Sequence, residues 1–83
     1  MYKEGEIVKL SRPHFVCHGY EFWEWRSMNL PIKRITRKGN PVIGREVFDK
    51  VTGLSLNFIG NKRLPVEFRR SKIEPKEKQH DSK

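Results

Sequence analysis

The sequence predicts a small all-β fold, a single-domain barrel of about five strands. The chain contains no alanine, the strongest helix-forming residue, whereas the strand-favouring valine and isoleucine number six each and phenylalanine five. Short segments in which apolar and polar residues alternate are separated by closely spaced turn residues, as in small barrels and sandwiches. A chain of 83 residues is long enough for one domain with a small core.

The N-terminal third begins with a strand and continues in segments that are harder to assign. Residues 6–10 alternate between apolar and charged side chains, which predicts a first strand. We expect a long irregular loop over residues 11–19, because Pro13 and Gly19 interrupt regular structure. In residues 20–25, aromatic and charged side chains fall on both faces, so a strand and a short helical turn both remain open.

The middle of the chain predicts two further strands. Residues 32–37 form a strand rich in positive charge, and residues 42–48 form the next. The Lys-Gly-Asn-Pro sequence at 38–41 is a strong turn signal between them. Gly44 lies inside the second of these strands and is expected to mark a bend.

The C-terminal part predicts the last strands of the barrel. A hairpin loop at 49–53 leads into residues 54–58, where leucine and phenylalanine alternate cleanly with polar residues. After a turn at 60–63, residues 64–68 repeat the alternation. Pro65 indicates either that this is an edge strand or that the strand begins there.

The domain is expected to end near residue 75. Ile73 is the last strongly apolar residue and is expected to seal the barrel. Residues 76–83 contain no apolar anchor, which predicts a flexible charged C-terminal tail after a domain of residues 1–75.

The order of these segments resembles, at fold level, a Src-homology-3-like (SH3-like) barrel of the KOW or Tudor type. The similarity covers roughly residues 4–75. It is carried by the opening sequence at 5–10, the long loop after it, three meandering strands, and residues 70–75, which are similar to the short helical turn and final strand of such barrels.

The resemblance implies three classes of partner. Peptide-binding members hold proline-rich ligands in an aromatic groove, Tudor-like members hold methylated side chains in an aromatic cage, and KOW-like members bind nucleic acid or the transcription and translation machinery. The peptide-binding branch usually has an acidic first loop. In this chain that loop carries Arg12, His14 and His18, which disfavours that branch.

The charge of the chain points to a polyanionic partner. Eighteen lysines and arginines against ten acidic residues give a formal net charge of +8, which attracts polyanions and speeds encounter with them. Nucleic acid is the leading candidate, with DNA favoured over RNA, and an acidic protein surface is the competitor.

The cellular setting follows from further features. The N-terminal residues form no apolar signal segment, and no apolar run approaches the length of a membrane span. The single cysteine, Cys17, excludes an intramolecular disulfide. We therefore expect a cytoplasmic protein that does not bind membranes.

The basic residues concentrate in three places: a strand with its turn, a second turn, and the segment after the last clear strand. Alternate turns of a meander reach the same end of a barrel, so these cations are expected to form a positive rim that contacts phosphates without reading sequence. The alternative is a set of solvated charges scattered around the barrel. The rim would comprise Lys33, Arg34, Arg37, Lys38, Lys62, Arg63, Arg69, Arg70 and Lys72.

An aromatic cluster accompanies these cations. A domain of this size can bury only two or three of Tyr20, Phe22, Trp23 and Trp25, so at least one of these rings is expected at the surface. Beside Arg26, an exposed Tyr20, Trp23 or Trp25 would stack on unpaired bases. The alternative for each single ring is that it fills the core.

Catalysis and metal binding have little support. His14, Cys17 and His18 lie close in sequence, but zinc requires three or four ligands, and the only other histidine, His80, falls in the predicted tail. There is no phosphate-binding glycine loop and no nucleophile with a partner at a useful spacing. We expect no metal, no cofactor and no enzymatic activity.

Two functional hypotheses follow. The first is a nucleic-acid-binding domain that holds phosphates on the basic rim and stacks bases on its aromatic rings. The second is a protein-interaction module, a small viral or bacterial regulator that docks on an acidic protein such as a component of the transcription machinery. The oligomeric state, monomer or dimer, stays open, although an edge strand at 64–68 would permit pairing between chains.

Overall fold

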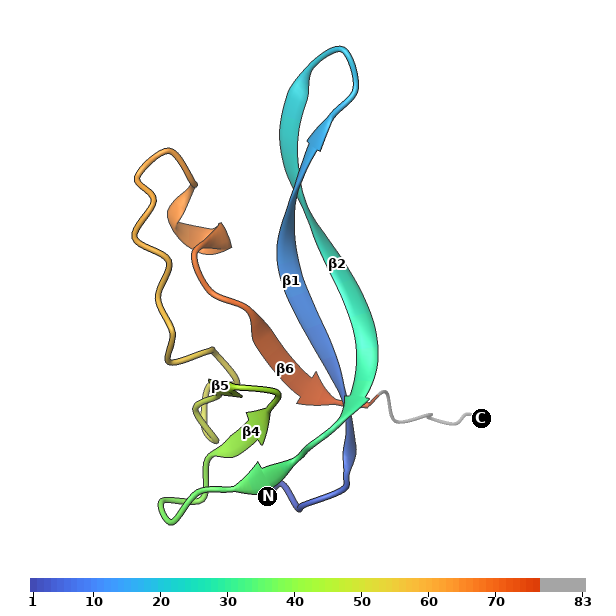
Figure 1. Ribbon diagram of the computed structural model, residues 1–83, viewed down its shortest axis with the longest axis vertical. Helices are drawn as coiled ribbons and strands as arrows, with labels where there is room; N and C mark the ends of the chain where they lie inside the picture. The colour runs from blue at the N-terminus through green and yellow to red at the C-terminus, as the bar shows by residue number, and fades with distance from the viewer. Residues whose placement is uncertain (77–83) are drawn as a thin grey trace.

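The computed structural model describes residues 1–76, and these residues form two three-stranded antiparallel sheets (Figure 1). The all-β prediction is confirmed, with no α-helix in residues 1–76. The two sheets do not close into a barrel within this part of the chain. Except for Lys76, the predicted tail at 76–83 lies outside the described residues. The first sheet has the order β2 (Glu21–Pro31), β1 (Ile7–Cys17), β6 (Lys72–Pro75), and the second has the order β3 (Arg34–Ile35), β4 (Pro41–Ile43), β5 (Glu46–Val47).

The segment predicted as an irregular loop is half of a long hairpin. β1 and β2 pair over their full lengths, from Ile7 opposite Pro31 to Cys17 opposite Glu21. The prediction of a loop at 11–19 is therefore wrong, and the strand choice for residues 20–25 is the correct one. Gly19, with φ +83°, marks the hairpin turn and not the end of an irregular stretch.

Pro13 is compatible with this strand because of where its nitrogen points. The Ile32 N–H donates to the Glu6 carbonyl, and the His18 N–H donates to the Tyr20 carbonyl, so even-numbered residues bond across the hairpin. Odd-numbered residues of β1 face the other side, where β6 pairs only with Val8 to Ser11. The missing N–H of Pro13 therefore removes no ladder bond.

The second sheet is built from shorter strands than expected. Only Arg34 and Ile35 of the predicted strand 32–37 are in β3. The predicted strand 42–48 is instead a tight hairpin of β4 and β5, which bends at Gly44. Gly44 has φ +63°, a conformation that other residues rarely adopt, so the expected bend there is confirmed and divides the strand in two.

Two predicted strands in the C-terminal part are absent from the described structure. Residues 54–58 form only isolated bridges, and residues 64–68 contain a 3-10 turn, η1 (Val66–Phe68). Pro65 has φ −56° and stands directly before this turn, a position that its fixed ring favours. Alternation indicates a possible face in both segments, but within residues 1–76 no strand pairs with them beyond the single bridges at Leu54 and Ser55.

The main core lies between the two sheets at the end of the molecule nearer the N-terminus. It is formed by Val8, Leu10, Ile32, Ile43, Phe48 and Ile73, with Phe48 fully buried. Ile73 is 3% exposed and belongs to this core, although no closed barrel is found for it to seal in residues 1–76. Tyr2 packs against this cluster, and burial raises the pKa of its phenol, with smaller contributions from the charges of Glu6 and Glu74.

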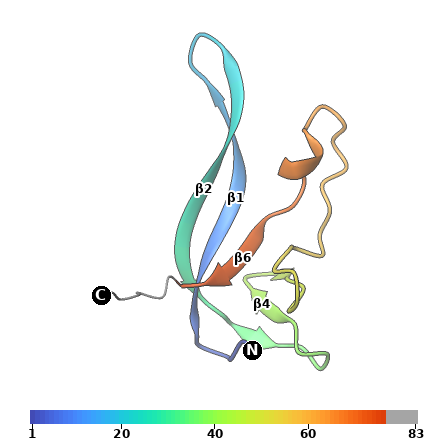
Figure 2. The ribbon, with the colours of Figure 1, turned by 180° about the vertical axis from the view of Figure 1, so that it is seen from behind.

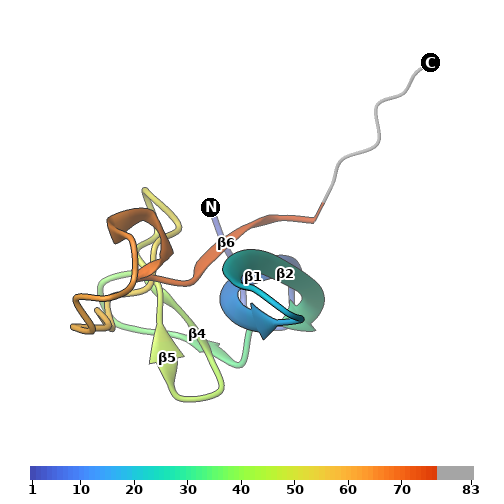
Figure 3. The ribbon, with the colours of Figure 1, turned by 90° about the horizontal axis from the view of Figure 1, so that it is seen from above.

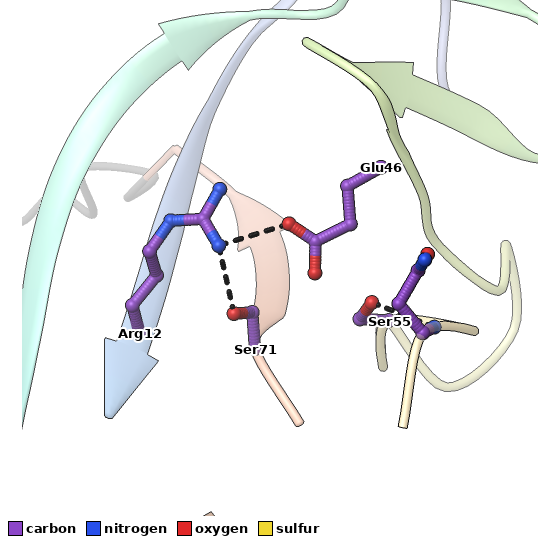
Figure 4. A network of polar contacts seen from close by, with 5 residues as sticks. Arg12, Glu46, Ser55 and Ser71 are labelled. Atoms are coloured by element: carbon purple, nitrogen blue, oxygen red, sulfur yellow. Dashed lines mark hydrogen bonds and ion pairs between the residues drawn. The ribbon is translucent and has the colours of Figure 1, made fainter. Parts of the chain in front are cut away.

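Arg12 connects the two sheets by a polar contact (Figure 4). Its Nη1 donates to Glu46 Oε1 at 2.9 Å and to Ser71 Oγ at 3.1 Å. Arg12 belongs to β1 and Glu46 to β5, while Ser71 directly precedes β6. Nearby, the Ser55 hydroxyl accepts a hydrogen bond from the backbone N–H of Asn57 at 3.0 Å.

The outer half of the β1–β2 hairpin projects beyond this core. Figures 1 and 2 show the hairpin rising past the second sheet, with the segment between β5 and η1 rising beside it. The backbone N–H of Ile59 donates to the carbonyl of Arg69 at 3.0 Å, which ties that segment to the chain after η1. The projecting half of the hairpin and η1 together position the candidate site.

Candidate functional site

Four aromatic rings lie in contact along the outer hairpin and η1. Trp23 lies 5.0 Å from Phe15 between ring centroids, and Trp25 is stacked on Phe68 at 5.1 Å. Trp23 is also 6.5 Å from Phe68, which makes the arrangement continuous. We call Phe15, Trp23, Trp25 and Phe68 the aromatic row.

The hairpin register explains this row. Phe15 is directly opposite Trp23, and Pro13 is opposite Trp25, so all four side chains share one face of the two-stranded ribbon. The 3-10 turn then adds Phe68 from a distant part of the sequence. Neither tryptophan belongs to the buried core cluster.

The row is partly open to solvent. Phe15 is 44% exposed, and both tryptophans are half-buried, so each ring has contacts on one side and free surface on another. Large rings that are held in place but not covered are typical of interaction surfaces. The exposed aromatic surface predicted from the sequence is therefore present, although Tyr20 contributes to it separately.

Tyr20 and Arg26 lie away from the aromatic row. Tyr20 is 68% exposed and stacks on Phe22 at 5.3 Å. Phe22 and Arg26 occupy even-numbered positions of β2, so they face the opposite side of the hairpin from the tryptophans. Arg26 is also engaged, because its Nε donates to Glu24 Oε2 at 3.0 Å. The expectation that Arg26 stands beside Trp23 and Trp25 is wrong.

Positive charge reaches the aromatic row at two points. The Lys72 ammonium lies 5.4 Å from the centre of the Trp25 ring, within the range of a cation–π contact. Arg63 lines a pocket of about 370 Å³ together with Phe15 and Trp23. Glu21 lines the same pocket and is its acidic member.

The two arginines after η1 have different roles. Arg70 lies over the Phe58 ring at 5.2 Å. Arg69 is 5.9 Å from the same ring, but its Nε donates to the Leu64 carbonyl at 2.8 Å. Arg69 therefore holds the loop before η1 in place, and Arg70 lies against Phe58, outside the row. We count Arg63 and Lys72 as the flanking cations of the row.

The remaining predicted cations lie elsewhere. The end of the molecule where the N-terminus lies carries four of them. Arg34 is in β3, Lys33 directly precedes this strand, and Arg37 and Lys38 follow it. Figures 1 and 2 show the β3–β4 turn at the end opposite the segment that precedes η1 and carries Lys62 and Arg63. A single rim that unites these turns is therefore wrong. The physical reason is that the chain after β5 does not return as a meander strand.

A hollow of about 830 Å³ lies at a different place in the described part of the chain. Its lining includes Arg12, Lys33, Arg45 and Glu46, together with apolar side chains such as Leu30. Arg12 and Glu46 neutralise each other in an ion pair. No aromatic ring is among the described residues that line this hollow. It offers charge without stacking, whereas the smaller pocket beside Trp23 offers both.

Metal-binding groups are sparse in the described residues. Residues 1–76 contain no cluster of three or more His, Cys, Asp or Glu side chains arranged to hold a metal ion. His80 falls outside the described residues. Cys17 is exposed at the end of β1. Within the described part of the chain, none of the helical segments has the length and apolar character needed to cross a bilayer.

The sequence interpretation missed two members of the row, Phe15 and Phe68. Phe15 was assigned to a loop because of Pro13, and Phe68 to a strand because of alternation. The turn at Gly19 is the sequence signal for this pair, because a hairpin centred on Gly19 places Phe15 opposite Trp23. Nothing local in the sequence signals that Phe68 packs on Trp25.

Comparison of the chain with family models, with curated proteins and with solved structures gives no match. The chemistry of the site is therefore drawn from its own rings, charges and distances. The site is a continuous aromatic surface with cations at its sides, and Glu21 is the acidic residue of the pocket beside Trp23.

Proposed function

We propose that this chain binds single-stranded nucleic acid, with DNA favoured over RNA and with low sequence specificity. The observation that supports this most directly is the Lys72 ammonium over the Trp25 ring, within a row of contacting rings. Bases stack on the aromatic row, and the flanking cations contact phosphates on either side.

The chemistry of the site matches this ligand in two respects. Every base has a π-face, so stacking on aromatic side chains contributes about 1–3 kcal/mol per base with little regard to sequence. Lysine and arginine beside the rings neutralise phosphates and release counterions, which makes affinity depend on salt. Because these contacts read neither base edges nor groove shape, low specificity follows.

We also propose that the fold is an SH3-like barrel in open form. It is supported by the 3-10 turn that precedes the last strand and by the pairing of β6 with β1. KOW-like members of that resemblance bind nucleic acid, which agrees with the chemistry of the row. The fold alone does not carry function.

A protein-interaction module is the second candidate, and one observation favours it. A pocket of about 380 Å³ lined by Leu54, Phe58, Val66, Glu67 and Arg70 lies on the described surface. Phe58 is 53% exposed and Val66 is 70% exposed. Apolar surface beside arginine suits an acidic protein partner, such as a component of the transcription machinery engaged by a small viral or bacterial regulator.

Fluorescence anisotropy with labelled single-stranded DNA, single-stranded RNA and duplex DNA of one sequence tests the proposal. We expect the single strands to bind more tightly than the duplex, because stacked pairs hide the faces of the bases. Trp23→Ala removes a ring from the row and is expected to weaken single-strand binding about 5- to 100-fold, the loss of one stacked base.

The matched control is Tyr20→Ala, which removes an exposed ring from outside the row. It is expected to leave affinity nearly unchanged. Equal losses in the two variants would show that the row is not the binding surface. Absence of binding to all three polymers at low salt would reject nucleic acid and direct attention to an acidic protein.

A further inference from the structure

The outer edge of β2 is long and unpaired in the described structure. β2 has eleven residues, and among residues 1–76 it pairs only with β1. Figure 3 shows the second sheet and η1 on the far side of β1 from β2. Natural edge strands are usually protected by charged side chains, lysine above all, by internal proline or by a bulge. The charged side chains of β2 are Glu21, Glu24 and Arg26, and the last two pair with each other. β2 has no lysine, its only proline is its last residue, Pro31, and its pairing with β1 runs without a bulge.

The free backbone groups of this edge lie on alternate residues. Even-numbered residues of β2 bond to β1, as the bonds of Tyr20 and Ile32 at the two ends of the hairpin indicate. The odd-numbered residues, Trp23, Trp25 and Ser27 among them, therefore point their N–H and C=O groups outward. An antiparallel partner must place its own outward-pointing residues opposite these.

The side chains of β2 are self-complementary about Trp25. On the even-numbered face, Phe22 and Glu24 precede Trp25, and Arg26 and Met28 follow it. When a second copy of β2 runs antiparallel with Trp25 opposite Trp25, Phe22 faces Met28 and Glu24 faces Arg26 of the second copy. Apolar side chains meet apolar ones and opposite charges meet, twice over by symmetry.

The same alignment satisfies the backbone. With Trp25 opposite its own copy, odd-numbered residues stand opposite odd-numbered ones, for example Trp23 opposite Ser27. Both strands then present N–H and C=O groups to each other at these positions, as an antiparallel ladder requires. A shift by one residue would oppose outward residues to inward ones and would also place Glu24 opposite Trp25.

We infer that two copies of this chain pair through the outer edges of their β2 strands, antiparallel and centred on Trp25. The product is one continuous sheet in which both aromatic rows lie on the same face, because the two-fold axis is perpendicular to the sheet. Glu24 and Arg26 now form an ion pair within one strand, with side chains 38% and 58% exposed, and exchange partners across the interface. This inference does not depend on the ligand of the aromatic row.

Charge reversal with mixing tests the pairing. In Arg26→Glu each cross-strand ion pair becomes a contact between two carboxylates, and in Glu24→Arg a contact between two guanidinium groups. We expect sedimentation equilibrium to show a wild-type dimer and to show each variant with a dimer dissociation constant raised about tenfold or more, since two symmetric pairs are lost.

An equimolar mixture of the two variants is the decisive sample. Every cross-strand pair in the mixed dimer again joins a carboxylate to a guanidinium, while neither chain regains an ion pair within its own strand. We expect the mixture to dimerise with an affinity within about threefold of the wild type, and native mass spectrometry to find mixed dimers.

Three results would overturn the inference. A wild-type chain that is monomeric at its highest soluble concentration has no such interface. Single variants that dimerise as strongly as the wild type use another surface. A mixture that stays as monomeric as its components would show that a change within the strand, not cross-strand pairing, caused the losses.

Discussion

At Gly53, the backbone conformation and the packing both require glycine. The residue has φ +79°, and a Cβ added there would meet the backbone carbonyl oxygen of Ile73 at less than contact distance. The carbonyl of Gly53 also accepts the N–H of Ile73 at 2.8 Å. This contact places the start of β6 against the turn that follows β5, next to the core.

Gly53→Ala is therefore expected to lower the free energy of unfolding by about 2–4 kcal/mol, combining left-handed strain with displacement of the Ile73 backbone. Gly44→Ala is the matched control, because Gly44 also has a positive φ, +63°, but open space around its Cβ position. The control should lose only about 1–2 kcal/mol. Urea denaturation measures both, and equal losses would show that the Ile73 contact contributes nothing.

Single residues were predictable where local chemistry decides. The bend at Gly44 and the burial of Ile73 follow from a glycine within an apolar run and from an isolated apolar residue before a charged tail. The side chain with which a given residue forms a contact was not predictable from the sequence. Arg26 stands two residues from Glu24 on one strand face and pairs with it, although its place in the sequence beside Trp25 suggests a role with the tryptophans.

At the scale of elements, turns were predicted better than strands. The turns at 38–41 and 49–53 are present, since glycine, asparagine and proline act through local conformation. Strands need a partner in register, which alternation does not supply. Residues 54–58 alternate cleanly yet form only bridges, and residues 11–17 contain a proline yet form a strand because the proline faces an unpaired side.

The contact between β1 and β5 gives a second stability prediction. Glu46 is 16% exposed, so removal of Arg12 leaves a mostly buried carboxylate without its ion-pair partner. The Arg12 side chain is 47% exposed, and solvent screening limits the effect. Arg12→Met is expected to lower the free energy of unfolding by about 1 kcal/mol.

A double-mutant cycle with Glu46→Gln measures the coupling between Arg12 and Glu46. Arg45→Met, at an exposed neighbouring position, is the control for loss of an arginine that does not form this contact. The loss caused by Arg12→Met should shrink when Glu46 is already glutamine, and Arg45→Met should have little effect. Additive losses in the cycle would show that Arg12 and Glu46 do not stabilise each other.

At the scale of the whole molecule, net charge indicated a class of partner but not the place where it binds. The value of +8 is a sum, and the structure separates the basic residues into different parts of the molecule. The end with the main core carries Lys33, Arg34, Arg37 and Lys38, whereas Arg63 and Lys72 accompany the aromatic row. That division depends on where the chain after β5 runs, which no local pattern in the sequence specifies.

Binding of single-stranded DNA at the aromatic row is tested most directly by its salt dependence in two variants of equal charge. One carries alanine at Arg63 and Lys72, and the other carries alanine at Arg34 and Arg37, so each lowers the net charge of +8 by two. We predict that the first flattens the slope of log affinity against log salt by about 1.4, near 0.7 per lost phosphate contact. The second should retain a slope close to that of the wild type. Identical slopes in the two variants would contradict a binding surface at the aromatic row and would indicate attraction by net charge alone.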